Sequence, residues 1–311
     1  MISVALAVLP LARPIIGQPY NYVLQLGMAA LMWIALASSW NLIGGFTGYV
    51  SLGHNVFFGV GGYASGLALI HFGISPFASA FVVGVMSVGL GAIVGLITLR
   101  ARGDAFIIST IALLLMVSLL FDNWKFVGGS NGISLPLPPF ALEDVKIPFY
   151  YAMLLLAALA VVLSYRIAHS KFGLTLRAIA QDETKAEVAG IDTRRMKVAA
   201  FSLSAFCVGA AGAIWGYSLT YLRPTVFFSI AVAAQMVLMV IIGGRGTVAG
   251  PAVGALMLVA LNEISISQFG SSELNLAATG IVLLIVLLFF PSGVVGTLRE
   301  RGRLPSFLDW D

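Results

Sequence analysis

The sequence predicts an all-α protein, a polytopic bundle of transmembrane helices with nine or ten membrane segments, one of them broken. Its 311 residues are 59% hydrophobic and only 10% charged, whereas soluble globular domains carry about 25% charged residues. The mean hydropathy is +1.00. Apolar runs of roughly 17 to 25 residues, long enough to cross a bilayer as helices, recur between polar breaks. We therefore expect a single transmembrane domain over residues 1–311.

Nine apolar segments are expected to cross the membrane. A tenth run, residues 1–12, is short, lacks a basic leading region and is followed by Arg13 and Pro14, unlike a cleaved signal peptide. Whether it spans decides the side of the N-terminus. In chain order the nine segments are 23–43, 45–70, 77–99, 105–121, 149–167, 198–220, 229–242, 250–261 and 276–290.

The second segment, residues 45–70, is the one expected to be broken. It carries seven glycines, which weaken a regular helix in its first half. Non-helical backbone at membrane depth persists only inside protein or beside a wet cavity, so this segment should face the bundle interior. Its polar residues are candidates for the translocation path, although uncharged polar groups at depth also serve to bond neighbouring helices. The path candidates are Ser51, His54 and Asn55, with Gln235 from a later segment.

Small residues at helix-packing spacing predict close contacts within the bundle. Four glycine pairs have three residues between them, a spacing that lets helix backbones approach closely in lipid. With 34 glycines in the chain, some of these pairs arise by chance. The pairs are Gly62 and Gly66, Gly91 and Gly95, Gly212 and Gly216, and Gly250 and Gly254.

The orientation of the chain follows from its basic residues. The long charged loop over residues 166–197 contains seven Lys and Arg and four Asp and Glu, a net charge of +3, so it should lie in the cytoplasm. Alternation of the spans then places thirteen Lys and Arg inside, against three outside and Arg13 undecided. The turn-rich connection over residues 122–148, with its glycines and prolines, should be extracytoplasmic.

Within the cytoplasmic loop, residues 182–190 predict a short exposed helix. Asp182 can cap its N-terminus, Glu183 lies in the first turn, and Gly190 stands where a left-handed residue ends a helix. Asp192 or Thr193 can cap the helix that follows. Two interpretations remain open: docking into a groove of a partner protein, or an amphipathic helix lying on anionic lipid.

Several functional classes are disfavoured by residues that the sequence lacks. The three histidines are far apart and Cys207 is the single cysteine, so we expect no metal site. The turn GGRGT over residues 243–247 lacks the lysine of a phosphate-binding loop, so the chain should not hydrolyse ATP itself. Ionisable residues are almost absent from the middle of the spans, which disfavours an ion-coupled carrier. A passive channel for a small neutral solute stays possible.

Several stretches together resemble a known family. Residues 171–216, KFGLTLRAIAQDETKAEVAGIDTRRMKVAAFSLSAFCVGAAGAIWG, resemble the cytoplasmic loop and following helix of the branched-chain amino acid ABC transporter permeases of the LivM-like branch. The matching stretches occur in the same order as in the family and cover most of the chain from about residue 30. The others are WNLIGGFTGYVSLGHNVFFGVGGYASGLAL (40–69), RARGDAFIISTIAL (100–113), GGSNGIS (128–134), VLMVIIGGRGTVAGPAVGA (237–255) and PSGVVG (291–296).

The resemblance implies a multi-pass permease subunit of an ATP-driven importer in the bacterial cytoplasmic (inner) membrane. Its expected partners are a second homologous permease, two cytoplasmic ABC ATPases that bind the ATP, and an extracytoplasmic solute-binding protein. The permease itself would be neither an enzyme nor a cofactor protein. The solute would be a branched-chain or other amino acid, although urea and short-amide permeases of this branch look similar. By position the coupling helix that meets the ATPase corresponds to Asp182, Glu183, Ala186, Glu187 and Gly190.

Overall fold

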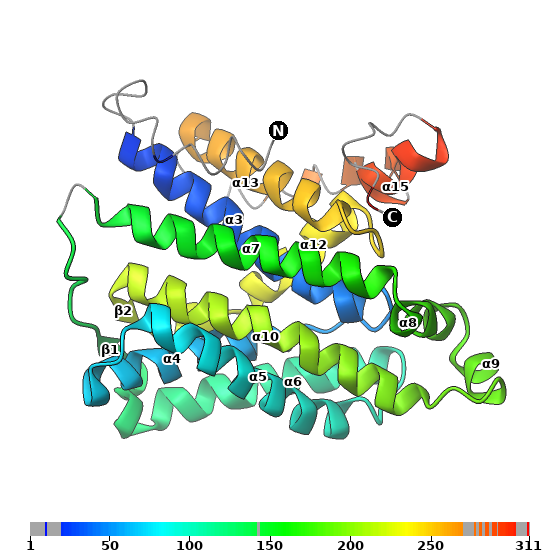
Figure 1. Ribbon diagram of the computed structural model, residues 1–311, viewed down its shortest axis with the longest axis horizontal. Helices are drawn as coiled ribbons and strands as arrows, with labels where there is room; N and C mark the ends of the chain where they lie inside the picture. Colours follow the sequence, from blue (N-terminus) through cyan, green and yellow to red (C-terminus); the bar gives the residue numbers. More distant parts are fainter. Residues whose placement is uncertain are drawn as a thin grey trace.

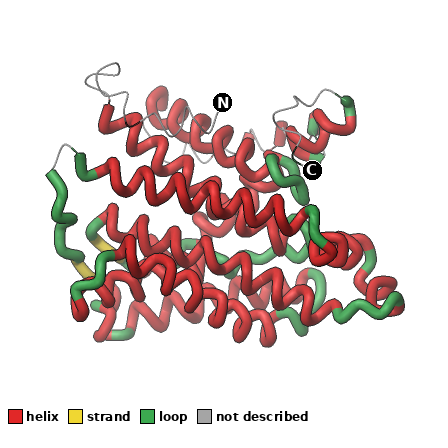
Figure 2. The backbone as a smooth tube through the Cα atoms, in the orientation of Figure 1, coloured by secondary structure: helices red, strands yellow, loops and turns green. Residues whose placement is uncertain are grey.

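The computed structural model describes most of the chain as a bundle of long helices joined by short turns (Figures 1 and 2). It describes residues 10, 20–141, 144–269, 277, 280, 281, 284, 285, 288–290, 292–302 and 310. The short N-terminal run apart from Pro10, and seven of the fifteen residues of the predicted segment 276–290, lie outside the described residues. Predictions on those two segments therefore stay predictions.

Eight stretches of the described residues are long and apolar enough to cross a membrane. They coincide with the first eight of the nine predicted segments, which confirms a polytopic all-α protein. Seven are single helices, and α11 (Pro224–Phe227) and α12 (Ile230–Gly243) together form the eighth. The seven are α3 (Tyr20–Gly44), α4 (Asn55–Phe72), α5 (Pro76–Thr98), α6 (Asp104–Asn123), α7 (Lys146–Ala168), α10 (Thr193–Leu219) and α13 (Gly250–Phe269).

Short elements occupy the two ends of the bundle. In Figure 1, α8 and α9 lie at one end and the two strands at the other, which agrees with opposite sides for the loops 166–197 and 122–148. The strands pair antiparallel, so the outer loop is tied to the turn after α10. These elements are the 3₁₀ turns η2 (Lys125–Val127) and η3 (Gly129–Asn131), β1 (Ile133–Ser134), β2 (Tyr221–Leu222), α8 (Lys171–Gln181), α9 (Glu183–Val188) and α15 (Gly293–Glu300).

Helix α10 is the centre of the bundle. In its most apolar window 78% of the residues are buried, against 22% in α6, so α10 is packed inside protein and α6 presents most of its surface outward. Figure 1 shows α10 running between α7 on one side and α4 and α5 on the other. A central helix surrounded by others needs small residues where backbones cross.

Glycines supply those crossings. A Cβ atom on Gly212 of α10 would lie 2.0 Å from the carbonyl oxygen of Phe58, and one on Gly61 of α4 would lie 2.2 Å from that of Gly209. A Cβ atom on Gly254 would lie 1.8 Å from the carbonyl oxygen of Met239. The spacing rule is thus confirmed at Gly212 and Gly254, where only glycine admits the neighbouring backbone.

The predicted break in the second segment is confirmed. Residues 45–54 form turns and extended chain, and a regular helix begins only at Asn55. Ser51 and His54 are fully buried, so this irregular chain lies inside protein as expected. A second break, between α11 and α12 at residues 228–229, was not predicted. We call residues 45–54 the irregular segment.

The opposite placement of the two loops can be tested by labelling. In a Cys207→Ala background, Lys125→Cys and Lys185→Cys should react from opposite sides of the membrane, because Lys185 is 86% exposed at the α9 end and Lys125 is exposed at the strand end. A membrane-impermeant maleimide added to intact cells should label only the Lys125→Cys variant. Permeabilised cells, as the control, should label both. Labelling of both variants in intact cells would contradict the topology.

Candidate functional site

Helix α9 is terminated at both ends by specific hydrogen bonds. The Asp182 carboxylate accepts a 3.0 Å bond from the amide of Lys185, as a capping residue does. At the other end Gly190 has φ of +89°, and the amides of Gly190 and Ile191 donate to the carbonyls of Glu187 and Ala186. This pair of bonds is the Schellman motif, which requires a left-handed residue. The predicted helix and its caps are confirmed.

The segments on either side of α9 are also capped helices. Asp192, one of the two residues predicted to cap the next helix, caps α10 by accepting a 3.1 Å hydrogen bond from the amide of Arg195. Helix α8 was not predicted: Ser170 accepts a 3.2 Å bond from the amide of Gly173, and Leu176 and Ile179 are buried. Residues 171–181 thus form a helix that lies across the end of the bundle beside α9.

A buried ion pair fixes α9 to the bundle. Nζ of Lys197 lies 2.6 Å from Oε1 of Glu183, and the side chains are 2% and 13% exposed. Nζ also donates a 2.9 Å bond to the phenol oxygen of Tyr49, which in turn donates to the Glu183 carboxylate. The ammonium lies 4.2 Å from the centroid of the Tyr49 ring. Three distant parts of the chain therefore meet here: the irregular segment, α9 and α10.

Further polar contacts complete this group. Arg102, from the turn between α5 and α6, lies 2.7 Å from Glu187 and 3.6 Å from Glu183. The Thr193 hydroxyl donates to Glu187 over 2.8 Å and lies 3.2 Å from Glu183. We call Tyr49, Arg102, Glu183, Glu187, Thr193 and Lys197 the charged cluster.

Burial and charge set the protonation states within the charged cluster. Burial, with the hydrogen bond to Glu183, raises the pKa of Tyr49 well above its ordinary value, so the phenol keeps its proton and can donate. Burial alone would raise the pKa of Glu183. The hydrogen bonds from Lys197 and Tyr49 and the positive charges of Lys197 and Arg102 outweigh it, and the pKa is lowered. At neutral pH the cluster therefore holds a negatively charged Glu183.

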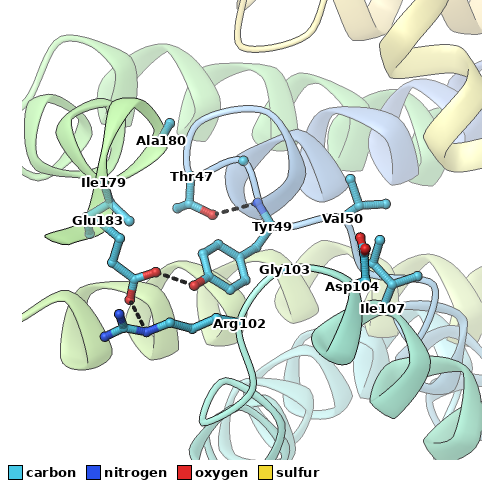
Figure 3. Close-up of a pocket in the computed structure, with 11 residues that line it drawn as sticks. Thr47, Tyr49, Val50, Arg102, Gly103, Asp104, Ile107, Ile179, Ala180 and Glu183 are labelled. Carbon is cyan, nitrogen blue, oxygen red and sulfur yellow. Dashed lines mark hydrogen bonds and ion pairs between the residues drawn. The ribbon is translucent and has the colours of Figure 1, made fainter.

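A cleft of about 410 Å³ opens beside the charged cluster (Figure 3). Figure 3 shows the Glu183 carboxylate between the Tyr49 phenol and the Arg102 guanidinium. The cleft is lined by the irregular segment, by the α5–α6 turn with the start of α6, and by α8 and α9. Its walls are Thr47, Gly48, Tyr49, Val50, Arg102, Gly103, Asp104, Ile107, Ile179, Ala180 and Glu183.

The opposite side of the irregular segment is held by the turn between α12 and α13. Arg245 donates to the carbonyl of Gly44 over 2.8 Å and to that of Gly48 over 2.7 Å. Asn41 on α3 accepts from the amide of Gly246 over 3.1 Å and donates to the carbonyl of Thr247 over 2.9 Å. The GGRGT turn is therefore a backbone anchor for the irregular segment.

The path candidates are brought together only in part. His54 bonds Ser204 over 2.7 Å, and the Asn55 amide donates to the carbonyl of Ser229 over 2.9 Å, at the start of α12. Ser51, His54 and Asn55 are fully buried, so none borders an open passage in this conformation. Gln235, half-buried, lies further along α12. Their role in the path stays a prediction.

A family model for "branched-chain amino acid transport system / permease component" matches residues 22–290. This match includes all but the first two residues of α3, the helices from α4 to α13, the charged cluster and the irregular segment. The chain belongs to this family. It is therefore a multi-pass membrane protein and a permease subunit of an ABC importer.

Relatives of the permease are also named as permease proteins. It is 26% identical to the high-affinity branched-chain amino acid transport system permease protein LivM of Escherichia coli K12, over 97% of this chain and 76% of the relative. It is 28% identical to LivH of Salmonella typhimurium, over 57% and 54%. The ribose import permease protein RbsC of Escherichia coli K12 is 27% identical, over 68% and 67%. No solved structure matches the permease significantly.

One predicted position in the permease is wrong. Ala186 was expected on the surface that meets a partner, but it is only 5% exposed because it faces the bundle. Glu183 also turns inward, toward Lys197, whereas Glu187, with its side chain 39% exposed, contacts Arg102 at the surface. The free side of α9 is formed by Thr184, Lys185 and Val188, with Val188 85% exposed.

The permease site also contains residues that sequence reasoning missed. Lys197 was counted only as a topological marker and Tyr49 as part of a glycine-rich stretch. A lysine that follows a helix cap by one turn and enters an apolar run was the available signal, because a lysine buried there needs a partner. Among the described residues no three His, Cys, Asp or Glu side chains are grouped to hold a metal.

Proposed function

We propose that this permease imports branched-chain amino acids across the bacterial inner membrane, driven by two partner ATPases that dock on α9. A second homologous permease would complete the membrane passage, and an extracytoplasmic binding protein would deliver the solute. The permease itself would hold no cofactor, because ATP binds to the partner subunits. This gives residues 166–197 the role of the coupling loop and α9 the role of the coupling helix.

The observation that carries the proposal is the two-sided character of α9. Its inner side is fixed by the buried pair of Glu183 and Lys197, at 2.6 Å. Its outer side leaves Val188 85% exposed at the tip of the cytoplasmic loop. An exposed apolar tip on a rigidly seated helix fits contact with a protein groove. A helix that rested on lipid would instead need a broad apolar face.

The solute class rests on the relatives. LivM and LivH are both named for branched-chain amino acid transport. The ribose relative shows that similar permeases carry other solutes, and urea or short amides are the alternative within this branch. Uptake of radiolabelled leucine, isoleucine and valine, with urea and acetamide as competitors, separates these cases. Competition by urea but not by valine would favour the alternative.

The proposed mechanism is a shift between two conformations. ATP binding closes the ATPase pair, the docked α9 helices follow, and the bundle changes which side of the membrane its passage faces. ATP drives this change only because it binds the two conformations of the complex with different affinities. A passive facilitator, the rival function, would transport without ATP.

Replacing Val188 with aspartate tests the docking surface. A charge placed in an apolar contact costs its desolvation, and residues at the centre of an interface contribute about 2 kcal/mol or more. We expect ATP-dependent uptake and solute-stimulated ATP hydrolysis to fall together, with weaker co-purification of the ATPase. Uptake into proteoliposomes and hydrolysis by the reconstituted complex are the measurements.

Val188→Ile, which keeps the apolar surface, is the matched control and should retain both activities. Full uptake by the Val188→Asp variant would contradict the proposal that α9 is the coupling helix. Uptake by the parent without ATP would support the passive facilitator.

A further inference from the structure

The charged cluster joins α9 to a part of the chain that enters the predicted membrane segments. Tyr49 lies in the irregular segment, five residues before His54. His54 bonds Ser204, which is eleven residues after the first residue of α10. At 1.5 Å per residue this contact lies about 16 Å along α10 from its cytoplasmic end. Five residues thus connect the coupling loop to a contact inside the predicted membrane segment 198–220.

The connection between Tyr49 and His54 is held along its length. The carbonyl of Ser51 accepts a 2.6 Å bond from the Trp40 indole, and the amide of Leu52 donates over 3.2 Å to the Thr110 hydroxyl. A Cβ atom on Gly53 would lie 3.1 Å from the Thr110 carbonyl. Extended chain fixed in this way transmits displacement of one end to the other.

The two ends of α12 bracket the same segment. Arg245, just beyond its C-terminus, holds the carbonyls of Gly44 and Gly48, and Ser229 at its N-terminus accepts from Asn55. The side of the segment toward α12 is therefore anchored by side chains that donate to main-chain carbonyls. The side toward α9 is held at Tyr49 by hydrogen bonds between side chains alone.

We propose that Tyr49, Glu183 and Lys197 form a transmission element that carries movement of α9 to the start of α4. The proposal rests on the coupling role of α9 proposed above and adds the positioning residues through which it acts. Movement of α9 displaces the Glu183 carboxylate, and Tyr49 follows because its phenol donates to that carboxylate. Lys197 holds both groups on α10, so the three move as a unit.

Neutralising the whole pair tests transmission without leaving a buried charge. Removal of one partner of a buried ion pair strands the other, but neutral replacements of similar volume for both are often tolerated. In the assembled importer, Glu183→Gln combined with Lys197→Met should therefore keep ATPase association and ATP hydrolysis. Uptake per ATP hydrolysed should fall about 5- to 150-fold, the range of typical coupling between two sites.

Tyr49→Phe is a milder variant that removes only the phenol oxygen, and its uptake per ATP should also fall. Hydrogen exchange at residues 49–55 should respond to ATP in the parent complex but not in either variant. Arg100→Met is the matched control and should leave the ratio of uptake to hydrolysis unchanged, because Arg100 is an exposed arginine in the turn after α5, outside both residues 166–197 and the charged cluster.

The possible outcomes separate transmission from a structural role. An unchanged ratio of uptake to hydrolysis in both variants would overturn the proposal. A parallel loss of uptake and hydrolysis would also overturn it, because the cluster would then only hold α9 in place. If instead the docking of the ATPase on α9 were wrong, the Val188→Asp variant would show full uptake.

Discussion

Leucine at Gly212 should prevent stable folding of the bundle. A Cβ atom there would lie 2.0 Å from the Phe58 carbonyl oxygen and 3.1 Å from the Gly62 amide nitrogen, both of them backbone atoms of α4. Backbone cannot move aside as a flexible side chain can, so α4 and α10 would have to separate. Overpacking costs about 1–3 kcal/mol even where side chains adjust, from a total stability of about 5–15 kcal/mol.

The measurement is the yield of monodisperse permease after purification in detergent, with its thermal unfolding midpoint. Gly89→Leu is the matched control, because Gly89 lies in a membrane helix where an added Cβ atom meets nothing within 4 Å. That variant should purify like the parent. A Gly212→Leu variant with unchanged yield and unfolding midpoint would contradict the close approach of α4 and α10.

Most of the fold could be predicted because lipid imposes a simple rule. Each span must satisfy its backbone internally and remain apolar over a fixed length, and both requirements are visible in the sequence. The glycine-rich stretch after α3 marked the break at residues 45–54 for the same reason. The break before α12 carried no such mark, since residues 228–229 are Phe and Ser.

Helix α8 was not predicted, because its eleven residues lie inside the charged loop, and the charges of that loop were interpreted as a sign of its side of the membrane. The caps of α9 were predictable because capping acts over three or four residues of sequence. The charged cluster was not, because its contacts are tertiary. Tyr49 and Glu183 are separated by 134 positions, and Tyr49 and Lys197 by 148. The position of Lys197 at the start of an apolar run is a local signal of burial, but no local pattern shows which residues are its partners.

Tryptophan at Ala186 should disrupt the seat of α9 even in the isolated permease. Ala186 is 5% exposed on the inner side of the helix, next to residues that hold the charged cluster. An indole cannot fit there, so α9 must lift away, and lifting separates Glu183 from Lys197, which are 2.6 Å apart. Breaking a buried pair in this way costs about 3–5 kcal/mol locally.

Hydrogen exchange of residues 182–190 in the detergent-purified permease, without any partner, is the measurement, and the Ala186→Trp variant should lose protection there. Val188→Trp is the matched control: it places the same bulk on the outer side, where Val188 is 85% exposed, and should leave exchange unchanged in the isolated chain. In the assembled importer both variants should lower uptake, one by unseating α9 and the other by altering the surface that meets the ATPase. Equal protection of residues 182–190 in parent and Ala186→Trp permease would mean that Ala186 does not face the bundle, and the original expectation of an outward Ala186 would return.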